Sequence, residues 1–117
     1  MTVYIVDDDA AVRDSLRILL HVEGFQTMCF PSGEAFLEHR PHIEDACLLL
    51  DLVLPGIDGL ELLNVIVQQR LRLHVIMMTG ASAARVRDHA IRAGAVAFFQ
   101  KPLNSECLTR LLRRLTR

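Results

Sequence analysis

A small set of acidic, hydroxyl and amine side chains follows the short apolar runs of this sequence. The set consists of Asp7, Asp8, Asp51, Thr79 and Lys101. Several carboxylates crowded together repel one another and need a cation if all of them are to stay ionised. Hard oxygen ligands without a neighbouring histidine or cysteine favour Mg²⁺ over zinc. A carboxylate nucleophile, a metal ion and donors for charged oxygens are together the parts that can hold a phosphoryl group.

Five apolar runs alternate with segments in which apolar residues recur every three or four positions, as they do in amphipathic helices. The runs span residues 3–6, 26–30, 46–50, 75–78 and 97–99. Residues 47–50 are continuously apolar, which is typical of a strand buried on both faces. The sequence therefore predicts an α/β fold, a doubly wound (βα)5 arrangement around a five-stranded parallel sheet of flavodoxin-like order 2-1-3-4-5.

Several residues stand where helices are expected to begin and end. Ser32, Asp58 and Ser105 precede helical segments and are predicted N-caps. Gly24 and Gly94 follow helical segments, where a left-handed C-terminal cap is expected.

The predicted sheet brings the candidate residues together. The carboxyl ends of parallel strands share one edge, and ligands bind there in the crevice between strands 1 and 3. Asp7, Asp8 and Asp51 are expected to face one another across that crevice. An isolated Asp after a strand is usually only a helix cap, but an acid pair, a single acid, a hydroxyl and an amine in this order are hard to explain in that way. Asp9 is expected to serve the N-terminus of the first helix and not to bind metal.

Length and composition predict one ordinary globular domain over residues 1–117, since 51% of residues are hydrophobic and 23% are charged. The net charge of −1 gives no overall sign of a nucleic-acid or membrane partner. No apolar run is long enough to span a bilayer, and the N-terminus has no basic leader before its apolar run. Three scattered cysteines predict neither disulfides nor a zinc site, so a reducing, cytoplasmic location is expected. Lys101 is the single lysine among thirteen basic residues.

Four motifs carry a resemblance to a known family. They are Val-Asp-Asp at 6–8, Asp-Leu-Val-Leu-Pro-Gly-Ile-Asp-Gly at 51–59, Met-Thr-Gly at 78–80 and Phe-Phe-Gln-Lys-Pro at 98–102. In this order and at these spacings, the sequence resembles the receiver domains of two-component response regulators, which have the CheY-like fold. Further similarity, in the segments around residues 5–16, 32–37 and 93–98, is to the FixJ-type transcriptional regulators.

The resemblance implies a role for each site residue. Asp51 would be the phosphoacceptor. Asp8 would bind Mg²⁺ directly and Asp7 through water, with the backbone carbonyl of Val53 as a further ligand. Lys101 would pair with the phosphoryl group.

The resemblance also implies a switch and its partners. Thr79 would donate a hydrogen bond to the phosphoryl group while Phe98 turns inward, and the Lys101–Pro102 peptide bond would be cis. The partner would be a sensor histidine kinase, and DNA would be contacted only through an output domain that this chain does not contain. Such a domain is a switch with its own phosphorylation and dephosphorylation chemistry, not an enzyme acting on an external substrate.

A surface for self-association is predicted on the fourth helix, over about residues 83–93. Arg85, Asp88 and Arg92 lie at spacings of three and four and so share one side. Phosphorylation is expected to produce a homodimer through this helix and the fifth strand, as the FixJ resemblance implies. An intrahelical Asp88–Arg92 pair is the alternative interpretation.

A second function remains open from sequence alone, namely a Mg²⁺-dependent phosphatase of the haloacid-dehalogenase type. Its DxDx[TV] signature is matched by Asp7 and Asp9, but Ala11 stands in the Thr/Val position. Turnover of an external phosphomonoester would favour the phosphatase, and a single stoichiometric labelling would favour the switch.

Overall fold

The computed structural model describes residues 2–39, 45–80 and 84–116. Strands and helices alternate along the chain, as predicted. The strands are β1 (Thr2–Val6), β2 (Gln26–Phe30), β3 (Ala46–Asp51), β4 (Leu73–Thr79) and β5 (Ala97–Gln100). The helices are α1 (Ala10–Val22), α2 (Gly33–Glu38), α3 (Gly59–Gln68), α4 (Ala84–Ala93) and α5 (Ser105–Leu115).

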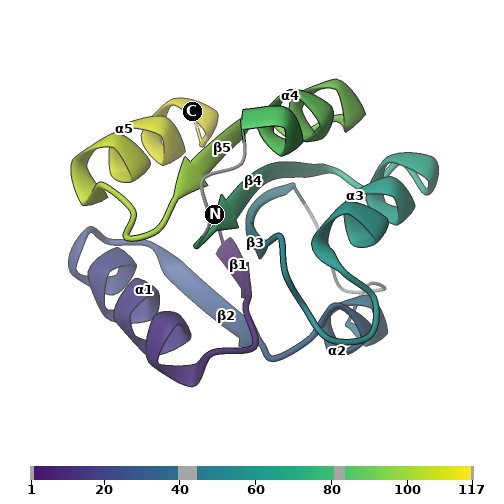
Figure 1. The fold of residues 1–117 in the computed structure, drawn as a ribbon. Coiled ribbons are helices and arrows are strands. Elements are labelled where there is room, and N and C mark those ends of the chain that lie inside the picture. The colour runs from purple at the N-terminus through teal and green to yellow at the C-terminus, as the bar shows by residue number, and fades with distance from the viewer. Residues whose placement is uncertain (1, 40–44, 81–83, 117) are drawn as a thin grey trace.

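The five strands form one parallel sheet in the order β2-β1-β3-β4-β5, which confirms the predicted topology. Figure 1 shows α1 and α5 on one face of this sheet and α2, α3 and α4 on the other. The strand order reverses beside β1, because the chain passes from the edge strand β2 back across β1 to β3. The predicted crevice therefore lies at the carboxyl ends of β1 and β3.

Alternate residues of each strand supply two cores. On β1, Val3 and Ile5 face the core that α1 and α5 cover, while Tyr4 and Val6 face the core beneath α2, α3 and α4. All six residues of β3 are buried, as the continuous apolar run predicted. Burial on both faces makes β3 a rigid support for Asp51 at its end.

The helix termini agree with the sequence at most positions. Ser32 caps α2, and Asp58 caps α3 in a reciprocal capping box with Glu61. The prediction for α5 is wrong by one residue, because Ser105 already belongs to the helix and Asn104 caps it by accepting a hydrogen bond from the Cys107 amide at 2.9 Å.

Gly24 and Gly94 have φ angles of +90° and +124°, the conformations expected after α1 and α4. The helix predicted from residue 83 begins at Ala84 in the described part of the chain, and Ala83 lies outside the described residues. Within residues 2–39, 45–80 and 84–116, no helix is long and apolar enough to cross a membrane.

Candidate functional site

The predicted site residues converge at the carboxyl edge of the sheet. Asp7 follows β1, Asp51 and Thr79 end β3 and β4, and Lys101 follows β5. Backbone hydrogen bonds hold these strand ends in register: the Lys101 amide donates to the Thr79 carbonyl at 2.7 Å, and the Leu52 amide donates to the Met78 carbonyl at 2.8 Å. The side chains therefore project from a fixed frame.

Three carboxylates form a cluster at this edge. Asp7, Asp8 and Asp51 each place an oxygen atom within 4.8 Å of the others. Asp7 is fully buried and Asp51 nearly so, whereas Asp8 is exposed. The sequence predicted this juxtaposition from the parallel sheet alone.

Asp9 does not join the cluster. Its carboxylate accepts a hydrogen bond from the Ala11 amide at 2.9 Å and so caps α1, at the helix N-terminus where its charge was predicted to lie. The phosphatase interpretation pairs Asp7 with Asp9, but here the partners of Asp7 are Asp8 and Asp51. The DxD match is therefore a helix cap that follows an acid pair.

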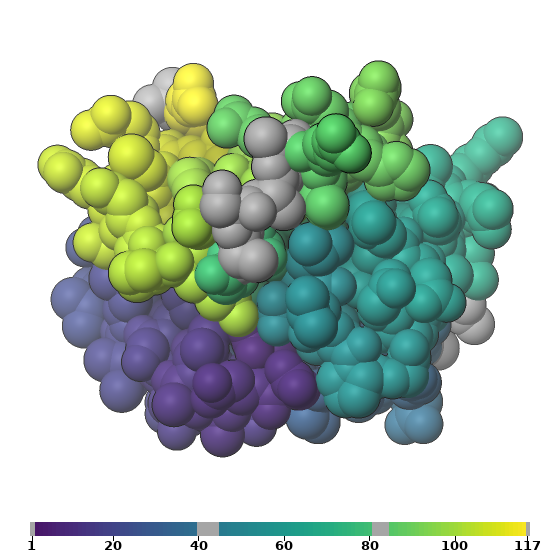
Figure 2. All heavy atoms as spheres, in the orientation of Figure 1, coloured from purple at the N-terminus to yellow at the C-terminus, as the bar shows by residue number. Residues whose placement is uncertain are grey.

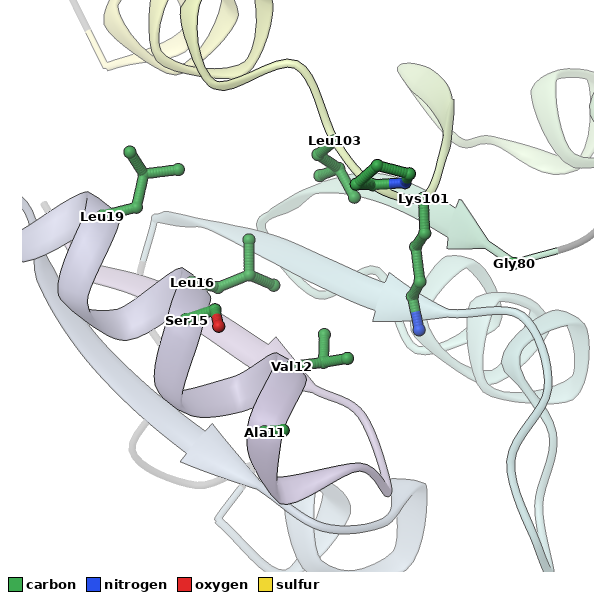
Figure 3. Close-up of a pocket in the computed structure, with 9 residues that line it drawn as sticks. Ala11, Val12, Ser15, Leu16, Leu19, Gly80, Lys101 and Leu103 are labelled. Carbon is green, nitrogen blue, oxygen red and sulfur yellow. The ribbon is translucent and has the colours of Figure 1, made fainter.

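Lys101 lies between two of the carboxylates. Its Nζ is 2.7 Å from Asp7 Oδ2 and 3.4 Å from Asp51 Oδ2. Figure 3 shows the side chain extended from the segment after β5, with the amine across the ends of the strands. Burial lowers the pKa of this amine, but its hydrogen bond to Asp7 and the charges of Asp51 and Asp7 outweigh that effect and raise the pKa. Lys101 is therefore a permanent cation at the site.

The surroundings of Asp51 destabilise the ionised form of its carboxyl group. Burial raises its pKa first, and the charge of Asp7 adds to that effect. The Lys101 ammonium and the Val53 amide, which donates to Asp51 Oδ1 at 3.4 Å, oppose the shift without cancelling it. A carboxylate held in this way gains stability from any further cation or hydrogen-bond donor.

The donor set fits Mg²⁺. Three carboxylates outnumber the one ammonium, and all the converging atoms on the acidic side are hard oxygens. Val53 lies in the segment that leaves β3, two residues after Asp51, with a solvent-exposed side chain. Its amide donates to Asp51 Oδ1 at 3.4 Å, which holds this residue beside the acid cluster.

The predicted switch residues occupy β4 and β5. Thr79 is buried at the end of β4. Phe98 is half-buried, pairs in register with Met77, and packs against the core beneath α2, α3 and α4. The Lys101–Pro102 peptide bond is cis, as expected.

The predicted self-association side of α4 is exposed. Arg85, Asp88 and Arg92 are all solvent-accessible. Among the described residues, Asp88 forms no ion pair with Arg92, so the alternative intrahelical interpretation has no support in the structure.

The sequence did not predict two further features of the site, a hydrogen bond from Arg13 and a hollow beside Lys101. Arg13 donates from Nη1 to the Asp7 carbonyl oxygen at 2.6 Å, tying the first helix to the end of β1. Beside Lys101, an open hollow of about 550 Å³ lies between α1 and the segment after β5. Figure 3 shows Val12, Leu16 and Leu19 of α1 on one side of it and Leu103 on the other. No sequence motif marks either feature, because both depend on how α1 sits on the sheet.

Known proteins are similar to this chain in sequence. Residues 3–113 match the response regulator receiver domain family. The chain is 37% identical to the transcriptional regulatory protein FixJ of Bradyrhizobium diazoefficiens, over 94% of this chain and 54% of that protein. It is 34% identical to FixJ of Rhizobium meliloti, over 97% of this chain and 55% of that protein. The chain thus spans about half the length of these relatives.

Solved structures agree with the sequence matches. The crystal structure of FixJ-N superposes with a TM-score of 0.90 at 34% identity, covering 98% of this chain and 92% of that one. Full-length FixJ from B. japonicum superposes with a TM-score of 0.91 at 36% identity, covering 99% of this chain and 57% of that one. These matches do not support the phosphatase interpretation. The fold, the acid cluster with its lysine and the matched residues 3–113 show that the chain belongs to the response regulator receiver domain family, the signalling switches of two-component systems, and is of the FixJ type.

Proposed function

We propose that Asp51 accepts a phosphoryl group from the phosphohistidine of a sensor histidine kinase. The observation that carries this proposal is the position of Asp51, a nearly buried carboxylate beside Asp7 and Asp8 with Lys101 within 3.4 Å. An Asp51 carboxylate oxygen would attack phosphorus, forming a P–O bond while the P–N bond to the kinase imidazole breaks and the imidazole leaves. The transferred group adds negative charge beside Asp7, so the acyl phosphate depends on counter-charge, which Lys101 and a bound cation would supply.

Asp7, Asp8, Asp51 and the Val53 carbonyl would hold Mg²⁺. When bound, the ion offsets the negative charge gathered on the carboxylates and phosphoryl oxygens. Asp8, being exposed, is the carboxylate most accessible to an entering ion, while Asp7 is fixed by Lys101 and by the Asp9 amide, which donates to Asp7 Oδ1 at 2.9 Å. The cluster is therefore arranged before any cation binds.

Lys101 and Thr79 would then respond to the phosphoryl group. The Lys101 amine, already between Asp7 and Asp51, needs only a small movement to pair with a phosphoryl oxygen. The Thr79 hydroxyl would donate a second hydrogen bond. Movement of Thr79 at the end of β4 would let Phe98 on the neighbouring strand turn inward and change the surface of β5 and α4.

The partners follow from the two faces next to the site. The apolar hollow beside Lys101, lined by α1, offers a docking surface for the kinase close to Asp51. The exposed side of α4 with Arg85, Asp88 and Arg92 would form a two-fold homodimer with β5 after phosphorylation. Because the chain spans about half the length of these relatives, we place DNA binding in a separate output domain. We place the receiver domain itself in the cytoplasm.

Labelling with acetyl phosphate and Mg²⁺ tests the proposal. One phosphoryl group per chain is expected, sensitive to hydroxylamine as an acyl phosphate is, and suppressed by a chelator. Asp51→Asn should abolish the labelling, whereas Asp45→Asn, an exposed aspartate just before β3, should not change it. Full labelling of Asp51→Asn would overturn the assignment, and so would catalytic release of phosphate without a labelled protein.

A further inference from the structure

The loop between β3 and α3 carries Val53 and is held firmly at both ends. The Leu52 amide donates to the Met78 carbonyl at 2.8 Å, and the Gly59 amide donates to the Leu52 carbonyl at 3.0 Å. The capping box at Asp58 fixes the start of α3. Between these anchors the chain turns through Gly56, whose φ of +71° is a conformation that other residues rarely adopt.

A glutamate from another helix reaches the middle of this loop. The Ile57 amide donates to Glu34 Oε2 at 2.9 Å, across 23 residues of sequence. The fit is close on both sides: a Cβ added at Gly56 would overlap the Glu34 carboxylate, and one added at Gly33 would overlap the Ile57 side chain. The first turn of α2 therefore packs closely against residues 56 and 57 of the loop.

The helix that presents Glu34 is itself fixed to the core. Phe36, fully buried, packs edge-on against Phe30 and Tyr4 with ring centroids 5.4 and 5.7 Å apart. Ser32 caps the helix by accepting from the Ala35 amide at 3.1 Å. Because α2 cannot shift without disturbing this aromatic cluster, Glu34 is a fixed acceptor and its hydrogen bond fixes the loop.

We infer that Glu34 is a positioning residue for the metal site: its hydrogen bond to the Ile57 amide holds the β3–α3 loop so that the Val53 carbonyl stays at the acid cluster. This inference rests on the proposed function, because it takes Val53 as a Mg²⁺ ligand. Glu34 itself contacts none of Asp7, Asp8 and Asp51 in the described structure and acts only through the loop. Removing the Glu34 carboxylate changes neither Asp51 nor Val53, but it lets the β3–α3 loop move.

Mg²⁺ titration of the unphosphorylated protein, followed by the amide resonances of Asp8, Asp51 and Val53, tests this role without measuring activity. Glu34→Ala should weaken Mg²⁺ binding by about 3- to 10-fold, the equivalent of one hydrogen bond between protein groups. Glu34→Gln keeps an acceptor oxygen and should bind Mg²⁺ within about twofold of the wild type. Glu38→Ala removes an exposed glutamate from the same helix, with no hydrogen bond or ion pair in the described structure, and should leave the dissociation constant unchanged.

A second variant approaches the contact from the loop. Gly56→Ala forces a Cβ against the Glu34 carboxylate and disfavours the positive φ, so it should weaken Mg²⁺ binding at least as much as Glu34→Ala. Dissociation constants are taken only from spectra with native dispersion, so a loss of stability does not enter the comparison.

The outcomes separate the two proposals. If the wild-type resonances do not respond to Mg²⁺, the proposed metal site is overturned, and the role of Glu34 with it. If the wild type binds Mg²⁺ and Glu34→Ala binds it equally well, only the positioning role is overturned. Equal weakening by Glu34→Ala and Glu34→Gln would show that the charge of Glu34 matters and not its hydrogen bond, which also overturns the inference.

Discussion

The two ends of this chain carry opposite charge and use it differently. Residues 1–83 contain twelve acidic and five basic residues, while residues 84–117 contain two acidic and eight basic residues. Figure 2 shows the later part, green to yellow, gathered along one side of the molecule, above the earlier part in purple to teal. A net charge of −1 therefore conceals a strongly polarised molecule.

The acidic part withdraws two of its twelve acidic side chains from water at one point. Asp7 and Asp51 are buried next to each other, and Lys101 from the basic part is their counter-charge. The described arginines of the basic part are exposed to solvent. Those at 87, 110 and 114 border a shallow hollow of about 400 Å³ and form no ion pair with any described residue.

This difference shows that the effect of a charge depends on how far the fold buries it. Exposed charges are screened by water and salt, so each contributes little to stability or reactivity. Buried charges interact strongly and depend on their partners. Substitutions of the same kind in the two regions should therefore have unequal effects.

The largest effect on stability is expected from removing the cation at the acid cluster. Lys101→Met leaves Asp7 and Asp51 without a counter-charge, and at pH 7 without Mg²⁺ the free energy of unfolding should fall by about 2 kcal/mol, less than for a fully buried pair because the lysine is partly exposed. Arg114→Met removes an exposed cation and should cost less than about 0.5 kcal/mol. Urea denaturation of both variants provides the measurement. Equal losses would erase the distinction between the cation at the acid cluster and the exposed basic surface.

The second effect is a weaker phosphorylated dimer when the charge of Asp88, on the exposed side of α4, is reversed. Asp88→Arg should weaken the phosphorylated dimer about tenfold or more, because it places like charges against Arg85 and Arg92 of the second copy. Sedimentation of the phosphorylated protein measures the association. Glu106→Arg makes the same change of charge on α5 and is the control. A phosphorylated chain that remains monomeric at high micromolar concentration would refute the predicted dimer.

The third effect is a gain in the free energy of unfolding from Asp51→Asn, and its size depends on pH. The pKa of Asp51 is higher in the folded protein than in the unfolded chain. Relative to high pH, Asp51 therefore stabilises the native state at a pH below its pKa in the unfolded chain. This contribution is lost as the pH rises through its pKa in the folded protein. Asp51→Asn should therefore stabilise the Mg²⁺-free protein by about 1 kcal/mol at pH 7, the size of a close repulsion in water. The gain should vanish near pH 3, where Asp51 is protonated in both states.

Urea denaturation at the two pH values measures this gain, with Asp45→Asn as an exposed control. A gain that grows toward low pH would contradict the assigned direction of the pKa shift. Saturating Mg²⁺ should reduce the gain at pH 7, because the ion offsets the same repulsion.

The smallest effect is expected from an exposed ion pair. Arg113 lies 2.6 Å from Glu23, with both side chains more than one-third exposed, and its guanidinium is 5.8 Å from the Phe25 ring centroid. After allowance for solvent screening, the coupling should be about 0.5 kcal/mol or less. A double-mutant cycle with Arg113→Ala and Glu23→Ala measures it, and 0.5 M salt should reduce it further. A coupling above that of Lys101 with Asp7 would reverse the comparison.

The sequence by itself determined the fold and the main members of the site. Alternating apolar runs and helical segments left a parallel (βα)5 sheet as the consistent arrangement, and parallel strands place their carboxyl ends at one edge. That was sufficient to predict that Asp7, Asp8 and Asp51 lie together. The place of Asp9 at the N-terminus of the first helix was also predicted, because a charge acts on a helix end locally.

Only the tertiary structure decided which groups touch within that frame. The family resemblance implied a phosphoryl partner for Lys101, but only the structure shows that Lys101 also pairs with Asp7, 94 residues away. The contact between Glu34 and the Ile57 amide has no sequence signal either, since it depends on where α2 lies against the loop. Periodicity records which face of an element is buried, but the distance between two side chains on different elements is set by how the core packs between them.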